Sequence, residues 1–380
     1  MILIRSVQLW WPGLDFKDEV WFIRHTLDYF QKGQLSENLK MFPANIPFVA
    51  IFYVFYLVWP NVETFELLVF FVYPLLVIGY YLMAKEIMNL YRKSSTPAIP
   101  AIMFFSFAPT VSIIPTYYWP KLLGLAALFF SCATLLHLLS SEHRKDRQWV
   151  IVIVSSTVLV FSHSISTALF ILTILFLYIT CEDRAKRWIL LRIGVFTFLM
   201  LTVAQYNFYS SYLRRIMSVI QGDITVMQFF KGHAFSSIES IFRTGPIVTL
   251  AHTGFIIVVG SLILLRAYRI LNHRSLVTKQ PKNRFAELLN LLKSDTILFS
   301  YTGFGVLSFI FAFFLSGLYL DPIRMISWAA LFAFPVIIPS KKSNALLFMV
   351  ILLTLFFLLV WTTNAPWGSP FGYAHGLNIP

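Results

Sequence analysis

Charged residues are scarce in this sequence. Only 12% of its 380 residues are Asp, Glu, Lys or Arg, whereas hydrophobic residues make up 58% and the mean hydropathy is +0.74. Soluble domains carry roughly 25% charged residues. The composition therefore excludes an ordinary soluble protein and favours a chain that folds in lipid. Cysteine is also rare, and Cys132 and Cys181 alone do not indicate a disulfide framework.

Several sequence motifs are absent as well. The chain has no glycine-rich phosphate loop, no zinc-ligand spacing and no nucleophile elbow. It also lacks internal repeats. A cleavable signal peptide is not evident, because Arg5 and Gln8 interrupt the apolar start. We therefore expect the chain to enter the membrane by means of its own spans.

Long apolar runs are abundant. Most of them match the ~20 residues that cross a bilayer as a helix. They predict an all-α, polytopic transmembrane protein with about ten spans, lying in the cell membrane. Residues 1–64 are expected to form an external N-terminal region, 65–361 the multi-span domain and 362–380 an external tail. The runs are 65–82, 98–114, 122–139, 149–180, 188–203, 247–265, 297–318, 323–338 and 345–361.

The basic residues indicate the topology. The net charge is +13, but Lys and Arg concentrate in short loops between the apolar runs, so we expect no nucleic-acid partner. The positive-inside rule places these loops in the cytoplasm. Membrane lipids are expected partners, and the long loop 266–293 is expected to contact anionic lipids. The loops are 85–93, 142–147, 182–192, 266–293 and 341–342.

The run 149–180 is too long for one span. As a single helix it would measure ~48 Å, against a bilayer core of ~30 Å, and both of its flanks are basic. A hairpin that turns at Ser162-His163-Ser164 returns the chain to the side it left. Each arm would be too short to span, and a turn at this depth requires protein or a water-filled cavity around it. We expect His163 to lie in a recessed external cavity.

An acidic cluster, Asp15, Asp18 and Glu19, lies in the predicted external region. A carboxylate here could act as a general base, or the cluster could hold a divalent metal. The alternative is a solvated surface segment. Further along, residues 46–59 are apolar but short and carry Pro47, and Pro60 follows, which predicts an interfacial helix.

Four basic or titratable residues are candidates for binding phosphate. His163 lies at membrane depth, where an ionisable group indicates function, although it could simply cap a helix. Arg324 follows Asp321-Pro322 at an external span boundary, and its guanidinium suits a phosphate oxyanion. Arg214 and Arg215 could contact donor phosphate, or could belong to an interfacial belt of aromatic and arginine residues.

The order of these segments resembles a known superfamily. The acidic pair in Phe16-Lys17-Asp18-Glu19 precedes a helical stretch, Gln31-Lys32-Gly33, the apolar segment 46–59 and a span that ends in basic residues. This order is similar to the first external loop and second span of the GT-C membrane glycosyltransferases. The segment 161–169 also resembles a hairpin turn of that superfamily. The topology is similar over most of the chain, whereas the sequence motifs are similar only in these segments.

The resemblance implies a function and a set of site residues. It implies a GT-C-like fold and a glycosyltransferase whose central acid is Asp18, with Glu19 or Asp15 beside it. The donor would be a sugar on a polyprenyl phosphate, and the acceptor an external glycan, lipid or protein. The loop 115–121 lacks the further acid that several members carry, which weakens a metal assignment. The Trp-Trp-Asp signature of oligosaccharyltransferases is also absent.

Two other functions fit the composition. A transporter or flippase for a lipid-linked or anionic substrate also combines many spans, broken helices and a few buried charges. A non-catalytic membrane subunit is the third reading. An external groove in which Asp18, His163 and Arg324 converge would favour the transferase, whereas a central site between symmetric halves would favour transport.

Overall fold

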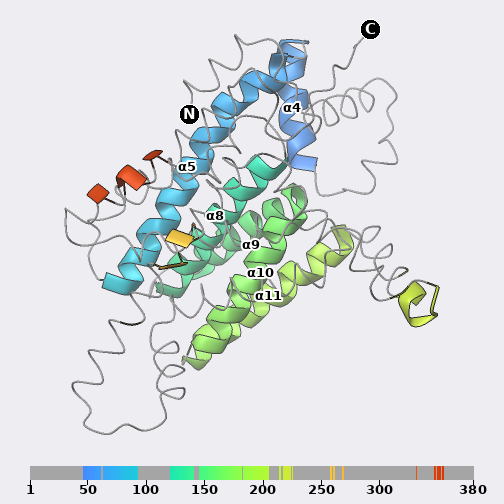
Figure 1. Ribbon diagram of the computed structural model, residues 1–380. Helices are drawn as coiled ribbons and strands as arrows, with labels where there is room; N and C mark the ends of the chain where they lie inside the picture. The colour runs from blue at the N-terminus through green and yellow to red at the C-terminus, as the bar shows by residue number, and fades with distance from the viewer. Residues whose placement is uncertain are drawn as a thin grey trace, which may run out of the picture.

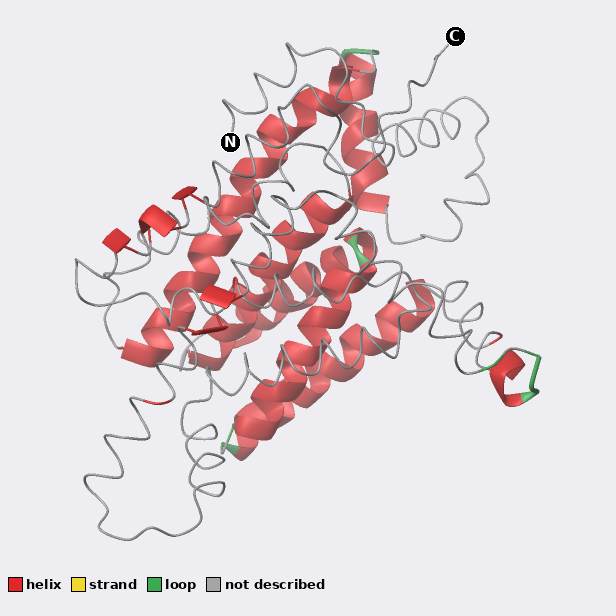
Figure 2. Cartoon of the chain, in the orientation of Figure 1, coloured by secondary structure: helices red, strands yellow, loops and turns green. Residues whose placement is uncertain are grey.

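The described part of the chain is a bundle of α-helices (Figure 1). The computed structural model describes residues 46–60, 63–92, 120–140, 145–181 and 183–204, with short stretches within 214–225, 257–268 and 331–354. Every longer secondary-structure element in this part is a helix, as the red ribbons of Figure 2 show. The helices are α4 (Ile46–Val58), α5 (Glu63–Arg92), α8 (Pro120–Ser140), α9 (Lys145–Ser162), α10 (Ser164–Thr180) and α11 (Arg184–Ala204).

Three of these helices contain segments that are long and apolar enough to cross a membrane. The segments are Phe71–Asn89 of α5, Leu122–Ser140 of α8 and Arg184–Ala204 of α11. Large apolar side chains are also exposed on α9 and α11, where lipid would cover them. These features support a helical membrane protein. The total of about ten spans and the GT-C-like fold stay predictions.

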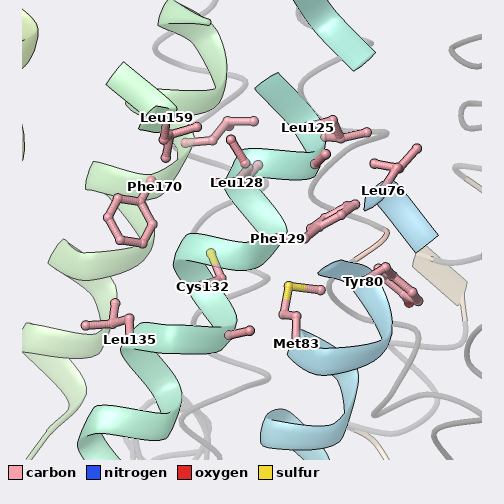
Figure 3. Packing of buried hydrophobic residues seen from close by; sticks show 14 of the residues in the cluster. Leu76, Tyr80, Met83, Leu125, Leu128, Phe129, Cys132, Leu135, Leu159 and Phe170 are labelled. Atoms are coloured by element: carbon pink, nitrogen blue, oxygen red, sulfur yellow. The ribbon is translucent and has the colours of Figure 1, made fainter. Parts of the chain in front are cut away.

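Helix α8 lies in the middle of the buried core. Figure 3 shows its Phe129 and Cys132 between Tyr80 of α5 and Phe170 of α10. All four side chains are at most 1% exposed. The rings of Tyr80 and Phe129 meet edge to face, with centroids 5.2 Å apart, a favourable arrangement for an aromatic pair. Burial of this kind fixes α8 against both neighbours.

Small residues let α8 approach both neighbours closely. A Cβ atom on Gly79 of α5 would lie 3.0 Å from the ring of Phe130 and 3.2 Å from the carbonyl oxygen of Ala126. Further along both helices, Glu86 of α5 contacts His137 of α8, so these two helices run parallel. Such packing is typical of helices in membranes, where small residues bring backbones together.

Helix α11 packs at the edge of the bundle against α9 and α10 (Figure 1). Its buried residues, Leu190, Ile193, Thr197 and Leu201, recur every three or four positions and form one face. At the link between α10 and α11, the guanidinium of Arg187 stacks 5.1 Å from the centroid of the Tyr178 ring. The opposite face of α11 is exposed and mostly apolar.

The segment expected to form a short apolar helix does so as α4, which is 13 residues long. Phe48 and Phe52 are fully buried, and α4 contacts α5 and α9. The side chains of Val54, Leu57 and Val58 are exposed. The sequence of α4 contains no charged residue, so both its faces are apolar. Its placement at the membrane interface stays a prediction.

The helices extend beyond the apolar runs that predict them. Helix α5 continues to Arg92, past Leu82, and α9 begins at Lys145, before Trp149. The apolar runs do not mark these ends, because hydropathy reflects contact with lipid rather than helix formation. Lys, Glu, Met and Leu are all good helix formers, so the polar ends continue the same helices.

The described basic segments lie at one end of the bundle. Hydrogen bonding between Glu86 and His137 joins the C-terminal ends of α5 and α8. The starts of α9 and α11 lie toward this end, at the lower left of Figure 1. The junction between α9 and α10 lies at the opposite end, beside the start of α8. Which end faces the cytoplasm stays a prediction.

Candidate functional site

The helical run breaks at His163. Helix α9 ends at Ser162 and α10 begins at Ser164, and His163 between them has extended backbone angles, φ −165° and ψ 122°. This confirms the turn predicted from the length of the run. The apolar helical segments on either side, Arg147–Ser162 and Ser166–Ile179, are each shorter than a full span.

Backbone and hydroxyl groups hold the break together. The N–H of His163 donates to the carbonyl of Leu159 at 3.2 Å, and the N–H of Thr167 donates to the carbonyl of His163 at 3.0 Å. The buried hydroxyl of Thr167 lies 3.1 Å from the Leu159 carbonyl and 2.9 Å from the His163 carbonyl. One side chain therefore links the last turn of α9 to the first turn of α10.

The imidazole of His163 caps α10. Its Nδ1 accepts a hydrogen bond from the backbone N–H of Ser166 at 3.3 Å and lies 3.0 Å from the Ser166 hydroxyl. The first N–H groups of a helix have no partner within the helix, so such a cap stabilises the new start. Because Nδ1 accepts, the proton of the neutral ring is on Nε2.

Gly124 of α8 makes room for His163. A Cβ atom on Gly124 would overlap Cβ of His163 and would lie 2.9 Å from its Cγ and 3.1 Å from Oγ of Ser166. Real Cβ atoms do not approach other atoms this closely. The break in one helical hairpin therefore depends on a missing side chain in the neighbouring helix. His163 itself is only partly buried.

Hydroxyl groups also line the contact between α8 and α9. The hydroxyls of Thr134 and Ser155 lie 3.0 Å apart and join the two helices. With the Gly124 contact to His163, this pairing shows that α8 and α9 run antiparallel. Ser131 and Ser156 are fully buried, and their hydroxyl oxygens have no hydrogen-bond partner among the residues that the structure describes. None of these residues was predicted from the sequence, although hydroxyl side chains within apolar runs were the available signal.

The remaining predicted site residues lie mostly outside the described part. Arg214 is exposed, and its backbone carbonyl accepts a hydrogen bond from the Ser218 hydroxyl at 3.1 Å. The catalytic candidates Asp15, Asp18 and Glu19, and the phosphate-binding candidates Arg215 and Arg324, are not among the described residues. Their convergence with His163 stays a prediction. Within the described ranges, no group of three His, Cys, Asp or Glu residues could hold a metal ion.

No protein family model, curated protein or solved structure matches this chain. The resemblance to the GT-C superfamily therefore rests on the sequence segments described above.

Proposed function

We propose that this chain is an integral membrane glycosyltransferase of GT-C type. It would transfer a sugar from a polyprenyl-phosphate donor to an acceptor at the end of the bundle that contains His163. The observation that carries the proposal is the helix break at this residue. It presents a capped imidazole and several hydroxyl groups at the end opposite the basic segments.

The break supports a site for a lipid-linked substrate in two ways. The flanking apolar segments are shorter than a span, so the break would lie below the membrane surface, at the depth of lipid head groups. In addition, polar groups within a membrane protein are costly unless they have partners, and they commonly mark a substrate path. A sugar attached to a lipid phosphate would be presented at this depth.

In the proposed reaction, Asp18 removes the proton from the acceptor hydroxyl. The acceptor oxygen then forms a bond to the anomeric carbon of the sugar, and the bond between that carbon and the phosphate oxygen breaks. Arg324 binds the departing lipid phosphate through paired N–H groups. The neutral ring of His163 donates a hydrogen bond from Nε2 to the donor but contributes no charge. Phosphate is a competent leaving group once its charge is balanced, so this scheme needs no metal.

The test is sugar transfer by the purified chain. Membranes or liposomes that contain the protein are incubated with radiolabelled polyprenyl-phosphate sugars, and labelled acceptor is measured. Asp18→Asn should reduce turnover by roughly 10²- to 10⁴-fold, because the general base is lost. Donor binding should change little. Arg324→Ala should weaken donor binding as well, because it removes contacts to phosphate.

Asp183→Asn is the matched control, since Asp183 caps α11 at the basic end of the bundle. It should leave turnover unchanged. If the wild type transfers sugar from no lipid donor, the proposal fails and transport becomes the better explanation. If Asp15 or Glu19 variants lose activity while Asp18→Asn retains it, the base is a different member of the acidic cluster.

A further inference from the structure

Helix α11 carries a charged residue on its lipid-facing surface. Arg192 is exposed, and so are Trp188 one turn before it and Val195 and Leu199 after it. Residues four apart lie on the same side of a helix, so Arg192 follows Trp188 along an apolar stripe. The buried face of α11, formed by Leu190, Ile193, Thr197 and Leu201, points elsewhere.

The length of α11 places this charge at membrane depth. Its 21 residues give about 31 Å of helix, barely the thickness of the ~30 Å core. Arg192 is eight residues after Arg184, so its Cα lies about 12 Å along the axis from the helix start. An arginine at this depth requires an anionic partner or contact with the polar boundary.

Two charged groups near the start of α11 already have other interactions. The guanidinium of Arg187 stacks on the Tyr178 ring. Oδ1 of Asp183 accepts hydrogen bonds from the backbone N–H groups of Ala185 at 2.8 Å and Lys186 at 3.4 Å. Within the described part of the chain, Arg192 has no ion pair or hydrogen bond with another side chain. Its partner must come from outside this set of residues.

We propose that Arg192 binds the head-group phosphate of an anionic phospholipid in the leaflet at the basic end of the bundle. Side chains on a helix tilt toward its N-terminus, so the Arg192 side chain reaches back toward the boundary at Arg184. Its guanidinium can donate two parallel hydrogen bonds to phosphate oxygens. Trp188 then lies at head-group level, as is usual for tryptophan in membrane proteins, and the acyl chains lie along Val195 and Leu199.

Charge complementarity favours an anionic lipid over a zwitterionic one. Arg184, Lys186, Arg187 and Arg192 all lie in the first half of α11, and such a cluster attracts anionic head groups. In a zwitterionic lipid, the ammonium group would be repelled by the same cluster. The site lies at the end opposite His163, so it is independent of the proposed transferase chemistry.

The experiment measures lipid binding to the purified full chain. The protein is held in detergent micelles and titrated with phosphatidylglycerol or phosphatidylcholine, and bound lipid is counted by native mass spectrometry. Arg192→Gln should weaken phosphatidylglycerol binding about tenfold, the loss expected for a charge-assisted contact. Phosphatidylcholine binding should be unchanged. Arg192→Lys keeps the charge but loses the paired donors. Its affinity for phosphatidylglycerol should lie between that of the wild type and that of Arg192→Gln.

Lys186→Gln is the matched control. It removes the same charge at the same end of α11, but Lys186 is six residues before Arg192 and so lies about 120° around the helix. It should retain nearly all phosphatidylglycerol binding. Equal weakening by Lys186→Gln and Arg192→Gln would overturn the proposal, because the lipid would then sense only net charge. Unchanged binding by Arg192→Gln would also overturn it. If Arg192→Gln does not fold, Arg192→Lys is the test instead. Wild-type affinity of Arg192→Lys for phosphatidylglycerol would refute the paired contact.

Discussion

The buried hydroxyl of Tyr80 donates a hydrogen bond of 2.9 Å to the backbone carbonyl of Leu331, which is 251 positions away in the sequence. Both residues are buried, so the bond satisfies a carbonyl that solvent cannot reach. The bond also ties α5 to a segment that follows Arg324.

Removing the Tyr80 hydroxyl should destabilise the protein. Tyr80→Phe leaves the Leu331 carbonyl buried without this donor, which typically costs about 1–3 kcal/mol. Unfolding by denaturing detergent in mixed micelles measures the change in free energy. Tyr268→Phe is the control because Tyr268 is 64% exposed. Wild-type stability of Tyr80→Phe would show that the Leu331 carbonyl does not depend on this donor.

Substitution of Gly124 should disturb the break at His163. A methyl group at this position overlaps the His163 side chain, and overpacking of this kind typically costs about 1–3 kcal/mol. Gly124→Ala should therefore lower the unfolding free energy and reduce sugar transfer. The matched control is Gly260→Ala, because a Cβ atom at Gly260 would meet nothing within 4 Å. Wild-type stability of Gly124→Ala would show that α8 can move away from the break.

Two substitutions of His163 separate its capping role from a catalytic one. Asparagine is also a good N-cap residue, so His163→Asn should keep the cap of α10 and near-native stability. It should nevertheless reduce sugar transfer, because the Nε2 donor is lost. His163→Ala should lose the transfer activity and also about 1 kcal/mol of stability. Full activity of His163→Asn would indicate that the imidazole serves only as a cap.

The serines between α8 and α9 should differ in their contributions to stability. Ser131 and Ser156 bury hydroxyls that have no partner in the described part of the chain, so replacement by alanine should leave the unfolding free energy unchanged or raise it by about 1 kcal/mol. Thr134→Val should lower it by about 1 kcal/mol, since it breaks the 3.0 Å contact with Ser155. Thermal unfolding of the three variants provides the comparison. Destabilisation by Ser131→Ala would show that its hydroxyl has a partner in the membrane.

Cys181 provides a native probe of topology. It is partly buried at the end of α10, whereas Cys132 is fully buried in α8. A membrane-impermeant maleimide should label Cys181 only from the cytoplasmic side and should not label Cys132. Cysteine introduced at Asp18 or Arg324 should be labelled only from the other side. Labelling of Cys181 and Asp18→Cys from the same side would contradict the predicted topology.

The sequence predicts the break at His163 for a physical reason. The run 149–180 exceeds the thickness of a bilayer and has basic residues at both ends, so one straight helix cannot satisfy both constraints. The short helix α4 is predicted by the opposite observation, because the apolar run 46–59 is too short to span a bilayer and has Pro47 and Pro60 at its ends. The ends of α5 and α9 could not be predicted from hydropathy, because residues such as Lys85 and Glu86 are polar but still favour helix.

Contacts between distant segments could not be predicted in this way. Neither the close approach of Gly124 to His163 nor the bond from Tyr80 to Leu331 follows from the local sequence pattern, because each depends on which helices become neighbours. For the same reason, the sequence places Asp18 and Arg324 on one predicted side of the membrane without bringing them together. The nitrogen of His163 that accepts from Ser166 likewise depends on the geometry of the turn, which the sequence does not specify.

The shortness of α9 and α10 has a consequence for the lipid around them. Their apolar portions, Arg147–Ser162 and Ser166–Ile179, give about 21–24 Å of hydrophobic length. Lipid of ordinary thickness must compress beside this hairpin, at a cost of fractions of a kcal/mol for each ångström of hydrophobic mismatch. The bilayer should therefore thin locally near His163 and draw water and head groups toward it. Membranes with short acyl chains should stabilise the protein more than membranes with long ones. Bilayer thickness alone would therefore favour cellular membranes that are thin over those that are thick.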